Sequence, residues 1–261
     1  MKKSKIFLLL LAPFLILAPT SSGAEFYIGA YAGINFASEV NPDFEFYQRS
    51  PGASALGLDP NRTIYATRHA KGIGVDPAPI FGGKIGYWFD RESVFGITMP
   101  TWLKYFGFEV DISYNQLNWP SQSVKVEPLV QHYVIENNAF AVTTSFLFMA
   151  RYGFLKDKEV PFGRLQPYIG VGPVLFITNQ KLNIGNDFRG TEADLGFAIE
   201  PGIRYMVKKN FSVNMAFRYK FIPNHLDVDD QIFDQAQRYH YIVMRTDYNL
   251  FDFIFGVAYH F

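Results

Sequence analysis

The chain has 261 residues and no cysteine, so neither disulfide bonds nor thiol chemistry contribute to its stability or activity. Its 24 basic residues balance 24 acidic ones, and aromatic residues are as frequent as charged residues, at 18% each. This composition leaves two all-β classes open, a soluble sandwich and a membrane barrel, and only the order of the residues separates them.

The N-terminus has the three parts of an export signal. Three lysines within the first five residues precede an apolar stretch at 6–18, and small residues follow at 22–24. These features predict a signal peptide, residues 1–24, that is cleaved after Ala24. A retained anchor is disfavoured because the apolar run is shorter than the roughly 20 residues that span hydrocarbon. Cleavage leaves 21 basic against 24 acidic residues, a formal charge of −3, so nucleic acid is not an expected partner.

Eight later segments alternate apolar with small or polar residues at period two, over the length that a membrane-spanning strand requires. In chain order, strands are predicted at 25–37, 79–90, 104–117, 138–153, 165–178, 191–207, 210–222 and 249–261. They predict an all-β fold, an eight-stranded antiparallel up-and-down transmembrane β-barrel.

The last segment shows the alternation most clearly. Phe251, Phe253 and Phe255 share one face, while Asp252 and Gly256 lie on the other. A soluble sandwich would also alternate. However, the polar faces here mix glycine and small residues with a few charges, as the interior of a narrow barrel demands, and the apolar faces are dominated by phenylalanine. We therefore favour the barrel.

The connections are predicted to alternate between long surface loops and shorter turns, and residues 25–261 to form one domain. Long loops are expected near 38–78, 118–137, 179–190 and 223–248. An even number of strands, with both termini on the periplasmic side, follows from closure, because an open edge in lipid would leave backbone groups unpaired.

Several short stretches resemble the outer-membrane-protein β-barrel family, which includes the outer-membrane protein A transmembrane domain and the opacity-type surface antigens. The matching stretches are Phe81–Tyr87, Phe106–Asp111, Pro167–Gly172, Gly202–Tyr205, Phe217–Tyr219 and Tyr259–Phe261. The resemblance implies export to the outer membrane of a Gram-negative-type bacterium, where outer-membrane lipid and lipopolysaccharide are expected partners.

The resemblance also implies that the C-terminal strand carries a signal for the barrel-assembly machinery. The candidates are Val257, Tyr259 and Phe261. The alternative is that these residues only cover the lipid face and its interfacial girdle.

Nine charged residues are predicted to face the lumen. They are Lys84, Glu109, Asp111, Arg151, Glu200, Arg204, Arg218, Lys220 and Asp252. Turning Arg204 or Arg218 toward lipid near the midplane would cost about 2–4 kcal/mol. Eight strands enclose a space that side chains can nearly fill, so paired charges would plug the barrel. The alternative is an ion pathway.

No catalytic, cofactor or metal site is predicted. Outer-membrane lipid A deacylases carry a His-x-Ser pair with a downstream Glu, whereas this chain has His225 and Asp227 without the hydroxyl that acyl transfer needs. Asp227, Asp229, Asp230 and Asp234 lack the glycine and the final glutamate of a Ca²⁺ loop, so a solvated acidic loop is favoured over a cation site.

The leading hypothesis is a non-enzymatic outer-membrane barrel that supports the envelope and displays loops for adhesion or for recognition of a surface ligand. The first alternative is a narrow barrel that carries small or apolar solutes, with a lateral opening in its wall. The second alternative is a lipid A-modifying enzyme.

Overall fold

The computed structural model describes residues 25–48, 63–89, 93–94, 97–98, 100–127, 132–183, 187–228 and 241–261. The predicted signal peptide lies outside these residues. The described elements are β1 (Glu25–Ala37), β2 (Asp43–Gln48), β3 (Thr63–Ala70), β4 (Ala78–Trp88), β5 (Ser93–Val94), β6 (Ile97–Thr98), the 3₁₀-helix η2 (Thr101–Tyr105), β7 (Phe106–Gln116), β8 (Trp119–Glu127), β9 (His132–Arg151), β10 (Leu165–Asn183), β11 (Asp187–Lys208), β12 (Phe211–Val228) and β13 (Tyr241–His260). Within these ranges, no helix is long and apolar enough to cross a membrane.

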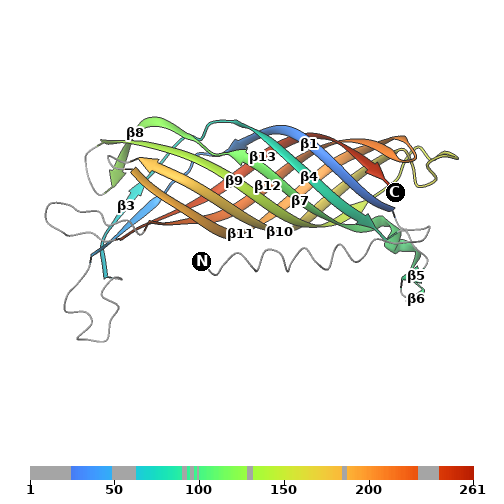
Figure 1. Cartoon of the computed structure of the whole chain (residues 1–261), viewed down its shortest axis with the longest axis horizontal. Coiled ribbons are helices and arrows are strands. Elements are labelled where there is room, and N and C mark those ends of the chain that lie inside the picture. Colours follow the sequence, from blue (N-terminus) through green and yellow to red (C-terminus); the bar gives the residue numbers. More distant parts are fainter. Residues whose placement is uncertain are drawn as a thin grey trace.

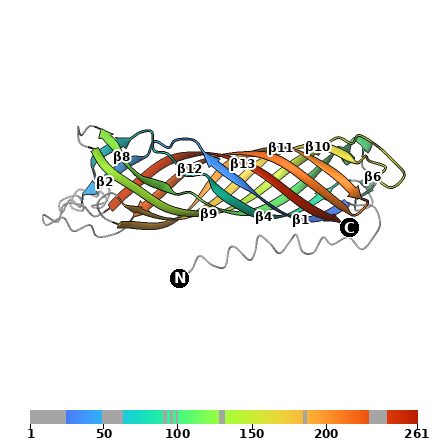
Figure 2. The same ribbon diagram turned by 90° about the horizontal axis from the view of Figure 1, so that it is seen from above.

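Eight strands close into a ring. They pair antiparallel in the order β1-β4-β7-β9-β10-β11-β12-β13, and β13 pairs back to β1 from Tyr27↔His260 to Ala37↔Leu250. The predicted eight-stranded antiparallel barrel is therefore confirmed. Figures 1 and 2 show the tilted strands wrapping around one axis, with the C-terminus and the β5–β6 hairpin at one end and β3 and β8 at the other. We call the end where β13 finishes the terminal end, and the opposite end the loop end.

The wall continues at the loop end through segments that the sequence predicts as loops. β13 pairs with β2, β2 with β3, β3 with β8, and β8 with β9. β9 to β13 are 18 to 22 residues long, so all four expected long loops contain strand. The β4–β7 connection likewise holds a short hairpin and η2 rather than a bare turn.

β9 to β13 are longer than predicted because the pattern of outward-facing residues changes part-way along them. Near the terminal end of β13, Phe253 and Phe255 face outward and Asp252 is buried. Toward the loop end, Arg245 faces outward, while Tyr248 is fully buried. Where a strand leaves the hydrocarbon and enters water, its outward-facing residues change from apolar to polar. A search of the sequence for apolar residues on the lipid-facing side therefore ends at that point.

The outer surface carries a belt of exposed apolar side chains. At the loop-end border, the belt includes Phe36 at 39%, Tyr114 at 44%, Phe140 at 43%, Phe197 at 50% and Phe221 at 40% exposure. Aromatic girdles of this kind mark the borders of the hydrocarbon around membrane barrels.

The interior has two zones. Toward the terminal end it is polar and charged. Toward the loop end it is mainly apolar, and the buried side chains there include Leu117, Trp119, Phe176, Ile222, Tyr248 and Leu250, beside a hydrogen-bonded group of buried polar side chains, Asn137, Thr178, Gln180 and Asn224.

Candidate functional site

All nine charged residues singled out in the sequence are at most 4% exposed and lie inside the barrel. The structure adds a tenth that sequence reasoning missed, Glu25, whose carboxylate contacts Arg151 at 2.5 Å. These ten residues comprise five basic and five acidic side chains.

Three tyrosines lie on the inner wall, each directly opposite a glycine of the next strand. The register pairs Tyr27 with Gly86, Tyr31 with Gly82 and Tyr168 with Gly202. A Cβ atom on Gly86 would fall 2.1 Å from the Tyr27 ring, and those on Gly82 and Gly202 would fall 2.3 and 2.4 Å from their tyrosines. Each ring therefore lies flat across a glycine, because any side chain there would collide with it.

This packing points each tyrosine hydroxyl at a carboxylate. Tyr27 donates to Glu109 at 2.5 Å, and Tyr168 donates to Glu200 at 3.0 Å. Tyr31 donates to Asp111 at 2.9 Å. The sequence pattern places these tyrosines on the inward face, but their role depends on glycines that only the register brings opposite.

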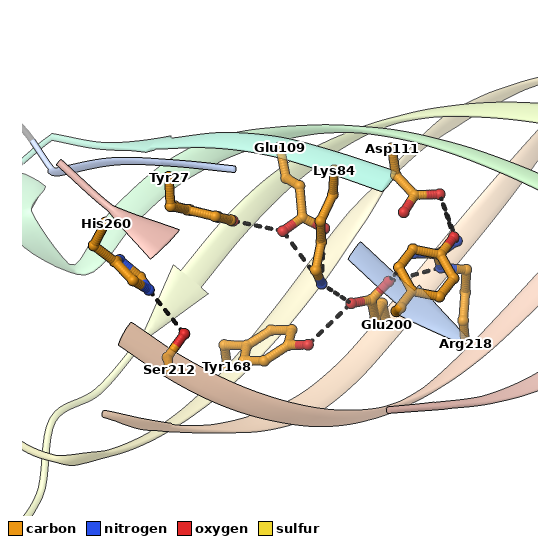
Figure 3. Close-up of polar contacts among 10 residues, drawn as sticks. Tyr27, Lys84, Glu109, Asp111, Tyr168, Glu200, Ser212, Arg218 and His260 are labelled. Atoms are coloured by element: carbon orange, nitrogen blue, oxygen red, sulfur yellow. Dashed lines mark hydrogen bonds and ion pairs between the residues drawn. The ribbon is translucent and has the colours of Figure 1, made fainter. Parts of the chain in front are cut away.

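At the centre of the network, Lys84 is shared between two carboxylates (Figure 3). Its Nζ lies 3.5 Å from Glu109 and 3.6 Å from Glu200. The ammonium also lies 5.8 Å from the centre of the Tyr168 ring. Lys84 thus joins β4 to β7 and β11 across the lumen.

Arg218 makes the densest set of contacts. Its Nη1 donates to Asp111 at 2.7 Å, and its Nε donates to Glu200 at 2.7 Å. A second nitrogen, Nη2, lies 2.5 Å from the same carboxylate oxygen, Oε2 of Glu200. Its Nη1 also lies 3.1 Å from the Tyr31 hydroxyl.

A smaller cluster lies nearer the loop end. Lys220 contacts Asp252 at 3.0 Å, and Asn35 donates to the same carboxylate at 2.5 Å. Asn115 then donates to Asn35 at 3.3 Å. This layer separates the charged zone from the apolar zone.

At the terminal end, the lumen is closed by Arg151 and its neighbours. The guanidinium lies 4.1 Å from the centre of the Trp88 ring and 4.2 Å from that of Phe162. His260 Nδ1 also lies 2.7 Å from the Glu25 carboxylate, and the other ring nitrogen of His260 lies 2.8 Å from the Ser212 hydroxyl.

Arg204 differs from the other lumen cations. It is 1% exposed, and within the described part of the chain none of its three guanidinium nitrogens has a hydrogen-bond partner. It stacks instead on aromatic rings, 4.2 Å from the centre of Tyr27 and 5.7 Å from that of Tyr168. The cation–π contact and the attraction of neighbouring carboxylates offset the free energy that the Arg204 guanidinium loses when it leaves water.

His225, the polar candidate nearest to the predicted acidic stretch, lies at the loop end of the barrel. His225 is half exposed and contacts Asp194 at 3.2 Å. Asp229, Asp230 and Asp234 lie outside the described residues. In the ranges that the structure describes, no group of three or more histidine, aspartate or glutamate residues is arranged to hold a metal.

The turn between β9 and β10, residues 152–164, is held by Asp157. Its carboxylate accepts the backbone N–H of Val160 at 2.7 Å and also contacts Arg164. The hydrogen bond from Val160 is the largest cause, and that from Arg164 the next, that lowers the pKa of Asp157 below its ordinary value. The same contact raises the pKa of Arg164.

The three proposed assembly residues line up on the outer face of β13. Val257 is 46%, Tyr259 49% and Phe261 68% exposed. The N–H of Phe261 donates to the carbonyl of Phe26 at 2.9 Å, which anchors the C-terminus to the first strand. Recognition by the assembly machinery stays a prediction.

The family model of the outer membrane protein beta-barrel domain matches residues 7–261. Among solved structures, Neisserial surface protein A is 14% identical with a TM-score of 0.41, over 92% of this chain and 100% of that chain. The N-terminal β-barrel domain of Pseudomonas aeruginosa OprF is 15% identical with a TM-score of 0.37, over 86% and 99%. Ail, the attachment invasion locus protein of Yersinia pestis, is 11% identical with a TM-score of 0.39, over 92% and 100%. No curated protein matches the chain in sequence.

Proposed function

Because the chain belongs to the outer membrane protein β-barrel family, whose members reside in the outer membrane of Gram-negative bacteria, we propose that it is a non-enzymatic structural barrel. Its lumen is closed to solutes, and its loop end serves adhesion or recognition at the cell surface. It reaches the membrane after cleavage of residues 1–24 and is folded there by the barrel-assembly machinery.

The main support for a barrel closed to solutes is the pairing of charges in the lumen. Arg218 and Lys84 bridge carboxylates from different strands, and the charges balance. An ion that entered would have to displace the ion pairs that these groups make with one another. Beyond them it would pass the buried apolar side chains around Phe176 and Tyr248, where an ion loses water without gaining a charged partner.

The surface role is supported by the way the wall extends past the apolar belt. With the termini in the periplasm, β2, β3 and β8 prolong the barrel outward from the lipid. Such an extension raises the connecting segments above the membrane surface on a rigid support, and binding residues are commonly carried on loops held by rigid scaffolds.

Single-channel recording with purified protein in planar bilayers tests the closed state. We expect no reproducible current steps for the wild type. A double variant, Lys84→Ala with Arg218→Ala, is the positive control. It removes the two long side chains at the centre of the lumen and should therefore conduct ions. Reproducible steps in the wild type would reject the closed barrel and favour the transport alternative.

The display role is tested by replacing residues 49–62, which join β2 to β3, with a short turn. This replacement leaves the paired strands on either side in place. We expect loss of binding of whole cells to host-surface or matrix ligands, with normal heat-dependent gel mobility of the barrel. Unchanged binding across such a ligand panel would contradict the role of this loop.

The lipid A-modifying alternative is tested separately. His225 contacts Asp194 but has no serine beside it in the sequence to act as nucleophile. We expect an unchanged lipid A mass spectrum on expression, and a new lipid A species would overturn the non-enzymatic assignment.

A further inference from the structure

The barrel wall is split at the loop end between β11 and β12. The ladder between these strands ends at Phe197↔Phe221. The ladders on either side continue much farther, to Asn183↔Asp187 between β10 and β11 and to Val228↔Ile242 between β12 and β13. We call the gap between residues 187–196 of β11 and residues 222–228 of β12 the seam.

A proline lies where the ladder ends. Met206 donates to Arg164 across β10–β11, and His260 donates to Asn210 across β12–β13. Even-numbered residues of β11 and β12 therefore direct their N–H and C=O groups away from each other, and odd-numbered residues direct theirs across the seam. In the continued register, the next seam-facing residue of β12 is Pro223, which has no N–H to donate.

Beyond Pro223, a side chain takes the place of the ladder. The Asp194 carboxylate accepts from the Asn224 side chain at 2.7 Å and lies 3.4 Å from the His225 backbone N–H. It also contacts the His225 ring at 3.2 Å. This latch holds the strands together without using the seam-facing N–H and C=O groups of Ala193 and Leu195.

The seam begins at the loop-end border of the apolar belt. Phe197 and Phe221 are exposed aromatic residues at this border, and the next outward residues of β11 are Leu195, which is 71% exposed, Ala193 and Thr191, while His225 is exposed on β12. In hydrocarbon, each unpaired backbone group would cost several kcal/mol, whereas water can satisfy it above the membrane. The end of the ladder is therefore compatible with a membrane protein only at this height.

The edge of β11 is also open from outside. The inward-facing residues of β10 at this level, such as Phe176 and Leu182, are fully buried. The corresponding positions of β11, from Gly190 to Gly196, are only half-buried. A row of unpaired N–H and C=O groups on an accessible strand is a template for another strand.

We propose that the seam binds an extended polypeptide segment of a partner, which adds as a strand to the free edge of β11. The site lies between two strand edges, so its occupant must have both of its own edges free. A lone extended segment meets that condition, whereas β11 of a second copy is already paired on one side with its own β10. An inserted strand needs β11 and β12 about 9.6 Å apart, twice the interstrand spacing, so the Asp194 latch must open first.

The probe is a fluorescent eight-residue peptide with the sequence of residues 221–228 and valine in place of Pro223. Its control is the same peptide N-methylated on the alternate residues that would face β11, because N-methylation removes the donors and keeps the side chains. Binding is measured by fluorescence anisotropy with the full barrel folded in detergent micelles. Hydrogen exchange reports protection of the backbone amides of Thr191 and Ala193.

We expect the unmethylated peptide to bind and to protect both amides, and the N-methylated peptide to bind at least about tenfold more weakly, since several hydrogen bonds are lost. Asp194→Ala opens the latch and should tighten binding, whereas Asp247→Ala, an exposed carboxylate on β13 outside the seam, should not. Pro223→Val restores the donor, lets the ladder extend and should abolish binding. Pro173→Val on β10 is its matched control.

Three results would overturn the proposal. The first is no binding to either the wild type or correctly folded Asp194→Ala. The second is equal binding of both peptides, which would mean apolar adsorption. The third is a dimer of the purified protein whose β11 amides are protected without peptide, which would make a second copy the occupant.

Discussion

Replacing Arg218 by methionine should be among the most damaging single changes in the barrel, whereas the same replacement at Arg204 should be tolerated. Both side chains are at most 1% exposed, and methionine approximates the length of the arginine stem in each case. The two positions differ in their partners. Arg218 contacts two carboxylates, and Arg204 has no hydrogen-bond partner among the described residues.

The loss of stability in each variant depends on the contacts that remain after the substitution. Without Arg218, Asp111 keeps the hydrogen bond from the Tyr31 hydroxyl but no ion pair within the described part of the chain, while Glu200 keeps Lys84 and Tyr168. Breaking a buried ion pair from one side costs about 3–5 kcal/mol, a factor of roughly 150 or more in the folding equilibrium constant. Without Arg204, the loss is a cation–π contact of about 2 kcal/mol, offset by the desolvation that an unbonded guanidinium no longer incurs.

The assay is urea unfolding in lipid vesicles, followed by tryptophan fluorescence and heat-dependent gel mobility. We expect Arg218→Met to lose at least about 2 kcal/mol more than Arg204→Met. Adding Asp111→Asn and Glu200→Gln to Arg218→Met removes the stranded charges and should recover part of the loss. Equal losses for the two single variants would refute the reasoning, because burial alone would then set the cost.

Three further predictions concern other parts of the molecule. Gly86→Ala should cost about 1–3 kcal/mol because its Cβ would meet a tyrosine ring at 2.1 Å, whereas Gly83→Ala, whose nearest neighbour is at 3.7 Å, should be close to neutral in the same unfolding assay. The β9–β10 turn should loosen in acid: Asp157 has a lowered pKa in the folded state, so its contribution is complete above about pH 4 and is lost as the pH falls through that lowered value. Hydrogen exchange of the Val160 amide measures this, and protection that is flat with pH, or equal in Asp157→Asn, would contradict it. Phe261→Ala should slow assembly in cells and leave refolding in detergent unchanged; equal slowing of both would assign the residue a packing role only.

The sequence determined the architecture wherever one chemical rule held along a whole strand. Within the apolar belt, every second residue meets lipid, so the alternation of Phe253 and Phe255 with Asp252 was enough to find the strand and the face. The same alternation indicated which nine charged residues point inward. The alternation did not lead to Glu25, which lies at the very start of the first strand. Glu25 is two residues before Tyr27 and therefore faces inward as Tyr27 does.

The tertiary structure alone decided which groups meet across the lumen. Contacts such as Lys84 with Glu200, or a tyrosine ring over Gly86, depend on register and curvature, which set distances between residues far apart in the chain. It also decided that the wall extends past the lipid border. Beyond that border the surroundings change from hydrocarbon to water, so polar residues face outward and apolar residues face inward. The local sequence pattern then no longer indicates whether the backbone N–H and C=O groups are paired. At the seam, Pro223 and the Asp194 carboxylate lie where the ladder stops, and only the neighbouring strand shows that the pairing ends there.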